Sequence, residues 1–270
     1  MKTKIALVTG ASSGIGEATA IALQKNGYQV YAAARRLERM RPLEALGIRP
    51  VRLDVTDDAV MQETVRAIHH EAGAIDVLVN NAGYGSYGAI EDVPMAEAHR
   101  QIEVNLFGLA RLTQLVLPAM RQQHSGKIVN VTSIGGKIAT PFGGWYHASK
   151  FAVEGLSDSL RNEVRQFGID VIIIEPGGIQ TEWGDIAMDN MMKASQHSAY
   201  QNLAEKTVRA FSGTTASNTD PSVIANLIVK AVAARRPRPR YRAGYMSWIV
   251  ALRRFISDEL FDRLVMGQLR

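Results

Sequence analysis

Two side chains that can move a proton lie one helical turn apart in this sequence, Tyr146 and Lys150. A spacing of four residues places both on the same face of a helix. A free tyrosine has a pKa of about 10 and is a poor base at neutral pH, but a nearby ammonium group stabilises the phenolate and lowers that value. We therefore expect Tyr146 to exchange a proton with an alcohol or a carbonyl, with Lys150 as its electrostatic partner.

A serine that follows a strand-like apolar run is the third candidate for this chemistry. Ser133 comes just after residues 127–131 and thirteen residues before Tyr146. The carboxyl ends of parallel strands form the ligand crevice of α/β sheets, so the Ser133 hydroxyl is expected to bond the substrate oxygen and stabilise developing charge. The serine lacks a nucleophile-elbow sequence and a partner histidine, which argues against a hydrolase.

A glycine-rich turn, residues 9–16, lies between the first strand-like run and the first helical pattern. Pyrophosphate is favoured at a helix N-terminus, and glycines let the backbone turn sharply and approach the phosphates closely. A strand before the turn and a helix after it are the context that a dinucleotide-binding motif requires. The residues expected to hold the dinucleotide here are Gly10, Ser12, Ser13, Gly14, Ile15 and Gly16.

The second strand-like run, residues 28–33, is followed by Ala34, Arg35 and Arg36 and by no carboxylate. An acidic residue at this place would bond the adenine ribose and repel a 2′-phosphate, whereas guanidinium groups bind phosphate as a fork of parallel donors. The sequence therefore favours NADP(H) over NAD(H). Arg35 is the first expected phosphate contact and Arg36 the second, with an added hydroxyl contact from Ser12.

Short apolar runs alternate with amphipathic ones through the first two-thirds of the chain. Strands are expected at residues 5–8, 28–33, 51–53, 75–79, 127–131 and 171–174, and helices at 14–26, 37–46, 57–71, 95–121 and 146–166. Continuously apolar, β-branched strands are typical of a sheet covered on both faces. The pattern predicts an α/β fold, a single-domain Rossmann-type doubly wound parallel sheet over residues 1–270.

The rhythm changes after the cofactor part, about residues 1–180, and gives way to a substrate lid and tail, about residues 181–270. A helical lid is expected at 181–219, then a helix at 221–234 and a strand at 240–242. Soft apolar side chains of the lid are expected to face a hydrophobic substrate, unless they only pack helices together. The lid candidates are Trp183, Met188, Met191 and Met192, and the opposite walls are assigned to Tyr84, Tyr87, Ile138, Phe142 and Trp145.

Composition excludes several other classes of protein. There is no cysteine among the 270 residues, which rules out disulfides and thiolate chemistry and agrees with a cytoplasmic location. No grouping of His, Asp or Glu has metal-ligand spacing, and no run approaches the roughly 20 apolar residues of a membrane span, so neither a metal nor a membrane is expected. No signal-peptide pattern opens the chain.

The net charge of +5 owes much to a late basic run, Arg235, Arg236, Arg238, Arg240 and Arg242. Such a run is compatible with nucleic acid or an anionic membrane, but its alternation with Pro237 and Pro239 favours a solvated connector leading into a strand. The tail, residues 245–270, is expected to form an amphipathic helix on its own domain, on a partner subunit or on a membrane surface.

Taken together and in order, these motifs resemble the short-chain dehydrogenase/reductase family over residues 5 to about 181. The matching positions are Thr9-Gly10-x-x-x-Gly14-x-Gly16, Asp54, Asn80 to Gly83, Asn105, Ser133, Tyr146-x-x-x-Lys150 and Pro176-Gly177. A weaker resemblance, in residues 176–183, the arginine-rich strand and the tail, is to the hydroxysteroid/retinol dehydrogenase-like carbonyl reductases.

The resemblance implies further roles for single residues. Asp54 would bond the adenine amine with Val55 packed beside it, and Asn81, Ala82 and Gly83 would lie along the adenosine. Asn105 would hold a water that relays protons from Lys150, and Lys150 would reach the nicotinamide ribose beside Tyr146. After the turn at Pro176 and Gly177, Ile179 and Thr181 would contact the carboxamide. Dimers or tetramers through residues 95–121 and 146–166 are implied as well.

The expected activity is that of an NADPH-dependent oxidoreductase. It transfers a hydride between the nicotinamide and a hydrophobic carbonyl or secondary alcohol, with Tyr146 as general acid/base. A dehydrogenase working toward oxidation and an epimerase are enzymatic alternatives. A non-catalytic NADP(H)-binding redox sensor is a further alternative, although a sensor has no need of Ser133, Tyr146 and Lys150.

Overall fold

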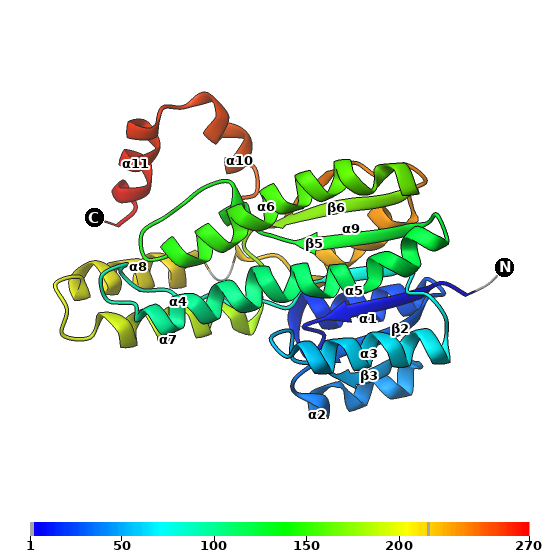
Figure 1. The fold of residues 1–270 in the computed structure, drawn as a ribbon. Helices are drawn as coiled ribbons and strands as arrows, with labels where there is room; N and C mark the ends of the chain where they lie inside the picture. The colour runs from blue at the N-terminus through cyan, green and yellow to red at the C-terminus, as the bar shows by residue number, and fades with distance from the viewer. Residues whose placement is uncertain (1–2, 215–216, 270) are drawn as a thin grey trace.

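A seven-stranded parallel sheet is the centre of the molecule in the computed structural model, which describes residues 3–214 and 217–269 (Figure 1). Its order is β3-β2-β1-β4-β5-β6-β7. The strands are β1 (Ile5–Thr9), β2 (Gln29–Ala34), β3 (Arg49–Arg52), β4 (Val77–Asn80), β5 (Gly126–Val131), β6 (Ile169–Pro176) and β7 (Arg240–Ala243). The order reverses between β1 and β4, so a ligand crevice is expected at the carboxyl ends of these two strands.

Helices cover both faces of the sheet, as the continuously apolar strands predict. Alternate residues of β1 point to opposite faces. Val8 belongs to the core that α1 (Gly14–Lys25) and α9 (Pro221–Ala233) close, together with α2 (Leu37–Met40). Leu7 belongs to the core closed by α3 (Asp58–Glu71), α5 (Gly108–Gln122) and α6 (Gly144–Val164). The predicted doubly wound Rossmann-type fold is confirmed.

The long helix expected at residues 95–121 is interrupted. It consists of α4 (Met95–Ile102), a π-helical segment (Glu103–Phe107) and then α5. A π-helical turn is rare and is found mostly at functional sites. The helix expected at residues 37–46 is likewise divided into α2 and a 3₁₀ turn (Arg41–Leu46), which ends at Gly47 with a φ of 76°.

The lid predicted at residues 181–219 contains α7 (Glu182–Ser195) and α8 (Gln201–Thr214). The tail is not one helix, because a 3₁₀ turn (Arg253–Phe255) separates α10 (Ile249–Leu252) from α11 (Asp258–Gly267). These short helices lie against the loop after β5, around an apolar cavity of about 150 Å³ whose lining includes Ile134, Ile138, Met246 and Phe261. The tail thus packs on its own chain. Among the described residues, no helix is both long and apolar enough to cross a membrane.

Candidate active site

The predicted proton-transfer residues meet at the carboxyl end of β5. Tyr146 and Lys150 lie in the first turns of α6, and each side chain is 7% exposed. The Lys150 ammonium is 5.9 Å from the centre of the Tyr146 ring and donates a 3.0 Å hydrogen bond to the carbonyl of Val131, the last residue of β5. Ser133 follows two residues later and hydrogen-bonds Tyr146. The structure therefore brings all three residues together.

Burial decides the charge state of this pair. Desolvation raises the pKa of Tyr146 to about 12, although the hydrogen bond with Ser133 lowers it in part. Desolvation lowers the pKa of Lys150 to about 8, against an opposing effect of the Glu154 carboxylate. The expected depression of the tyrosine pKa is therefore wrong for the chain alone, because the cost of burying a phenolate outweighs the hydrogen bond that lowers it. Tyr146 is consequently protonated at neutral pH, as an acid must be.

Asn105 lies in the π-helical segment, with its amide fully engaged. Its nitrogen donates to the Tyr84 carbonyl at 2.9 Å and to the Ser149 hydroxyl at 3.0 Å, and its oxygen accepts from the Tyr84 N–H at 3.0 Å. A Cβ at Gly83 would lie 3.1 Å from the Asn105 oxygen and 3.6 Å from the Lys150 ammonium. Asn105 and Lys150 thus converge on Gly83, and the bonds of Asn105 tie the loop after β4 to α6.

The glycine turn has the geometry of an anion cradle. Gly10 and Gly14 have φ values of 66° and 59°, which favour glycine, and a Cβ at Gly16 would lie 2.3 Å from the Gly10 carbonyl oxygen. Ser13, the residue before α1, makes no side-chain capping bond, so the N–H groups of the first helical turn are left to an external acceptor. These features fit a dinucleotide pyrophosphate.

The loop after β4 supports this turn from the neighbouring strand. The Asn81 amide donates to the Thr9 carbonyl at 3.0 Å, and the Asn81 and Ala82 N–H groups both donate to the Thr9 hydroxyl at 3.0 Å. The Asn81 side chain is therefore committed to holding the turn. Contacts with an adenosine from residues 81–83 would have to come mainly from the backbone.

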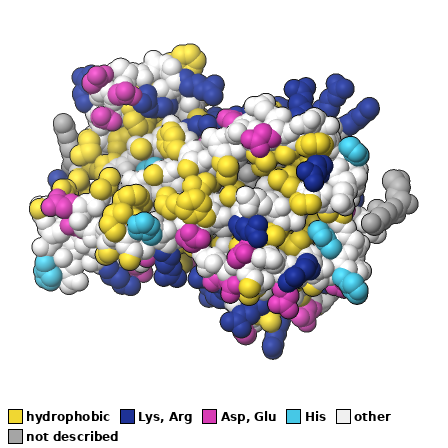
Figure 2. Space-filling view, viewed as in Figure 1, with side chains coloured by type: hydrophobic (Ala, Val, Ile, Leu, Met, Phe, Trp, Pro, Cys, Tyr) yellow, Lys and Arg dark blue, Asp and Glu magenta, His cyan; other side chains and the backbone are white. Residues whose placement is uncertain are grey.

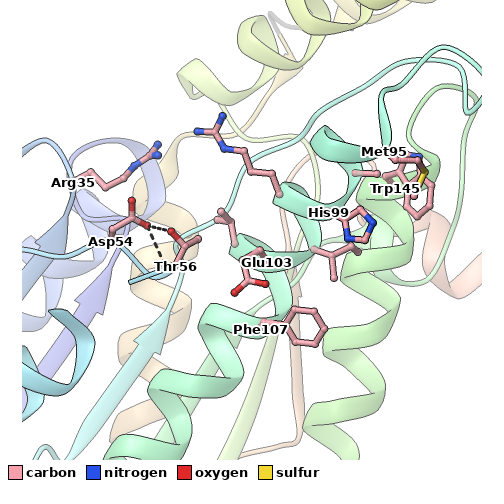
Figure 3. Close-up of a pocket in the computed structure, with 12 residues that line it drawn as sticks. Arg35, Asp54, Thr56, Met95, His99, Glu103, Phe107 and Trp145 are labelled. Atoms are coloured by element: carbon pink, nitrogen blue, oxygen red, sulfur yellow. Dashed lines mark hydrogen bonds between the residues drawn. The ribbon is translucent and has the colours of Figure 1, made fainter. Parts of the chain in front are cut away.

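The two arginines after β2 approach this region from different sides. Arg35 lines a cavity of about 640 Å³ together with Asp54, whose carboxylate accepts bonds from the N–H and hydroxyl of Thr56 (Figure 3). Arg36 instead donates to the hydroxyls of Ser12 and Ser13, at 3.2 and 3.3 Å. Arg36, the second expected phosphate contact, is thus the arginine that hydrogen-bonds the phosphate turn. Val55 is buried against Gly108 of α5.

The segment after β6 leads to the lid. The Gly177 N–H bonds the Ala243 carbonyl at 2.8 Å, and a Cβ at Gly177 would lie 2.1 Å from the Tyr245 carbonyl oxygen, so the turn after Pro176 needs a glycine. Ile179 packs toward Gly244 and the core of the sheet. The methyl group of Thr181 lies 2.9 Å from where a Cβ of Gly14 would be, and its hydroxyl caps α7. Thr181 therefore faces the phosphate turn, and Ile179 does not.

The aromatic surroundings of Tyr146 differ in part from the expected substrate walls. Its ring centre lies 5.0 Å from that of Trp183 in the lid and 5.7 Å from that of Tyr87, and these two rings also contact each other, at 5.8 Å. Met188 and Met191 are buried between lid helices, so packing was the correct alternative for both.

Two of the expected walls lie elsewhere. Trp145 lines the larger cavity beside Met95 and His99 (Figure 3), where α4 meets the start of α6. The hydroxyl of Tyr84 donates to Glu97 of α4 at 2.9 Å. Neighbouring residues of a helix do not share a face, and Trp145 therefore cannot follow Tyr146 into the crevice.

His147 is a supporting residue to which the sequence pattern assigns no role. Its Nδ1 lies 2.9 Å from the Gly135 carbonyl and its Nε2 accepts from the Thr140 N–H at 3.1 Å, which fixes the proton on Nδ1. Burial lowers the pKa of His147, so the ring is neutral. The Gly135 N–H in turn donates to the Ser133 hydroxyl at 3.0 Å. His147 thus braces the loop that positions Ser133, a role that needs tertiary contacts to recognise.

Part of the basic run neutralises buried carboxylates. Arg240 donates to Glu154 of α6 at 3.0 Å, and Arg242 donates to the fully buried Glu175 of β6 at 2.7 Å. Glu154 also accepts a 2.8 Å bond from Thr132, the residue before Ser133. The solvated-connector interpretation fits the exposed Arg235, Arg236 and Arg238 but is wrong for Arg240 and Arg242. Their spacing of two, which puts both on one face of a strand, is the signal that distinguishes them.

Comparison with known proteins gives the family. Residues 4–191 match the model of the short chain dehydrogenases. The chain is 39% identical to the oxidoreductase BOA17 of Botryotinia fuckeliana, over 90% of this chain and 89% of that protein. It is 36% identical to a 3-ketodihydrosphingosine reductase of Bacteroides thetaiotaomicron, again over 90% and 89%. A short-chain dehydrogenase structure from Streptomyces avermitilis matches with a TM-score of 0.82 and 30% identity over 98% of this chain and 96% of that one.

Two other solved structures of this fold hold a dinucleotide. A short-chain dehydrogenase/reductase from Burkholderia phymatum, with 25% identity and a TM-score of 0.80 over 93% of this chain and 92% of its own, is bound to NAD. An actinorhodin polyketide ketoreductase, with 30% identity and a TM-score of 0.76 over 90% of this chain and 97% of its own, is bound to NADPH. The chain belongs to the short-chain dehydrogenase/reductase family and is an oxidoreductase. Relatives of this fold use either nicotinamide dinucleotide, so the family alone does not choose between them.

Proposed function

We propose that this protein is an NADP(H)-dependent oxidoreductase acting on a hydrophobic carbonyl or the corresponding secondary alcohol, with Tyr146 as general acid/base. The observation that carries the proposal is the buried cluster of Tyr146, Lys150 and Ser133 at the carboxyl end of β5. A phenol whose pKa is about 12 retains its proton at neutral pH and is suited to donate it to a carbonyl oxygen that gains negative charge.

The bound dinucleotide would supply or accept the hydride, and side chains of the protein would transfer the proton and stabilise the substrate oxygen. Tyr146 donates its proton to the substrate oxygen during reduction and accepts it during oxidation. Ser133 donates a hydrogen bond to the same oxygen and stabilises its developing charge. Lys150 lies beside Tyr146 and stabilises a phenolate as the proton leaves. Gly83 and Asn105 border the Lys150 ammonium, and this is the point from which the lost proton would be replaced.

The choice of NADP(H) rests on the charges around the phosphate turn. Arg35 and Arg36 follow β2 with no carboxylate at its end, and Arg36 already bonds the hydroxyls of Ser12 and Ser13. A 2′-phosphate beside these groups would receive charge-assisted hydrogen bonds, which are the stronger kind. Arg35 would approach the same phosphate from the side of Asp54.

The substrate class rests on the aromatic surroundings of Tyr146. Trp183 and Tyr87 pack beside its ring and against each other, and aromatic surroundings of this kind suit a hydrophobic carbonyl better than a sugar phosphate. The 36% identical relative from Bacteroides thetaiotaomicron is named as a reductase of 3-ketodihydrosphingosine, and this supports a carbonyl substrate here.

The direct test is NADPH consumption by the purified protein with a panel of aldehydes, ketones and quinones, and NADP reduction with matching alcohols. The proposal expects turnover with at least one hydrophobic member. If NADPH binds but neither panel is turned over, the redox-sensor alternative is favoured instead.

We also propose that the protein associates through α4, α5 and α6. Figure 2 shows hydrophobic side chains gathered over these helices, and Met95, Phe107 and Phe151 are 56%, 55% and 46% exposed. Large exposed apolar patches mark interaction sites on soluble proteins. Phe107→Glu should therefore lower the molar mass measured by light scattering, and an unchanged mass would refute this interface.

A further inference from the structure

The first residue of the lid forms ion pairs with two arginines near the phosphate turn. Glu182 begins α7, and both of its carboxylate oxygens accept bonds from Arg39, at 2.8 and 2.9 Å. The same carboxylate lies 3.6 Å from the Arg36 guanidinium. These partners are 143 residues or more apart in sequence, so the contact joins the lid to the segment that follows β2.

Arg36 is shared between this carboxylate and the phosphate turn. One of its nitrogens, Nη2, donates to Ser12 and Ser13, while the other, Nη1, faces Glu182. Thr181, the residue before Glu182, packs against Gly14 of the same turn. The carboxylate is therefore held in place immediately beside the groups that the proposed function gives to the 2′-phosphate.

We propose that Glu182 is a specificity-determining residue that competes with the 2′-phosphate of NADP(H) for Arg36 and Arg39. Its negative charge occupies the guanidinium groups when no phosphate is present and repels the phosphate when it arrives. NADP(H) has to displace this carboxylate, whereas NAD(H), which has no 2′-phosphate, does not. Glu182 thus limits the preference for NADP(H), and the inference rests on the proposed role of Arg36 in cofactor choice.

The charges support this competition at neutral pH. Hydrogen bonding to Arg39 lowers the pKa of Glu182, with a smaller contribution from Arg36, so the carboxylate is ionised. Its position at the N-terminus of α7 also favours the ionised form. The side chains of Glu182, Arg36 and Arg39 are each about half exposed, which places the contact among screened surface ion pairs. The expected effect is accordingly modest, about two- to fivefold in Kd for NADPH.

The test is calorimetric titration of wild type, Glu182→Gln and Asp189→Asn with NADPH and with NADH. Asp189 is an exposed carboxylate on the same helix, so its variant matches the change in net charge without touching the arginines. Glu182→Gln should tighten NADPH about two- to fivefold and leave NADH unchanged. Glu182→Lys should tighten NADPH further, and Asp189→Asn should change neither. On an Arg36→Met background the gain from Glu182→Gln should shrink, because the arginine that Glu182 shares with the phosphate turn is gone.

Three results would overturn the inference: no change in NADPH affinity, an equal change for both cofactors, or weaker NADPH binding in Glu182→Gln. The last would mean that the carboxylate orders Arg39 for the phosphate instead of competing with it. The proposed function fails separately, and visibly, if the wild-type protein binds NADH as tightly as NADPH.

Discussion

The buried ammonium of Lys150 should cost the protein stability, and the cost should vanish at high pH. A folded-state pKa of about 8, against the ordinary 10.5, means that the unfolded chain binds the proton more tightly. At 1.36 kcal/mol for each tenfold change in proton affinity, the penalty is about 3 kcal/mol below pH 8. Stability should therefore rise with pH between about 8 and 10.5, because in this range the unfolded state alone still holds the proton.

Lys150→Met removes the charge and keeps most of the apolar stem. It also leaves the Val131 carbonyl without its 3.0 Å donor, at a cost of about 1–3 kcal/mol that does not depend on pH. The diagnostic quantity is therefore the difference in unfolding free energy between variant and wild type at pH 7 and at pH 10.5. That difference should shift by about 3 kcal/mol against the variant as pH rises.

Urea unfolding followed by far-UV circular dichroism at several pH values measures this difference. Lys230→Met, at an exposed lysine of α9, is the control and should show no such pH dependence. If the difference between Lys150→Met and wild type stays constant from pH 7 to 10.5, then Lys150 is not desolvated in the way described here.

Two further predictions concern cofactor choice and pH. Arg36→Ala should weaken NADPH roughly 10- to 100-fold by loss of charge-assisted bonds, while NADH affinity, measured by the same titration, should stay within about twofold. Carbonyl reduction should decline above about pH 8, because Lys150 loses its charge there while Tyr146, with a pKa of about 12, keeps its proton. Lys150→Arg should move this decline in kcat/KM upward, and an unmoved profile would assign it to another group.

The sequence predicted the sheet well because its signals are local. Apolar β-branched runs identified six strands, and the helix expected from Asp57 begins there as α3, with Asp57 accepting a bond from the Val60 N–H at 3.1 Å. The motif residues around β1 and β5 converge as expected, since parallel strands end at one edge of the sheet.

The π-helical segment around Asn105 had no signal, because its apolar pattern continues that of the flanking helices. Contacts between segments far apart in the sequence could not be predicted either. The partnership of Arg39 with Glu182 and the bracing of the Ser133 loop by His147 depend on tertiary positions. The sequence also predicted a lowered pKa for Tyr146 where burial raises it, because the sequence shows the nearby lysine but not the burial of both groups.

The central claim is that Tyr146 provides the proton for a hydride transfer. The most direct measurement follows deuterium from NADPH that carries deuterium at both C4 positions of the nicotinamide into the product, with wild type and Tyr146→Phe compared at saturating NADPH. We predict deuterium at the former carbonyl carbon in wild type, and a rate below about 1% in Tyr146→Phe with NADPH affinity unchanged. An unlabelled product, or a Tyr146→Phe rate near that of wild type, would contradict the claim.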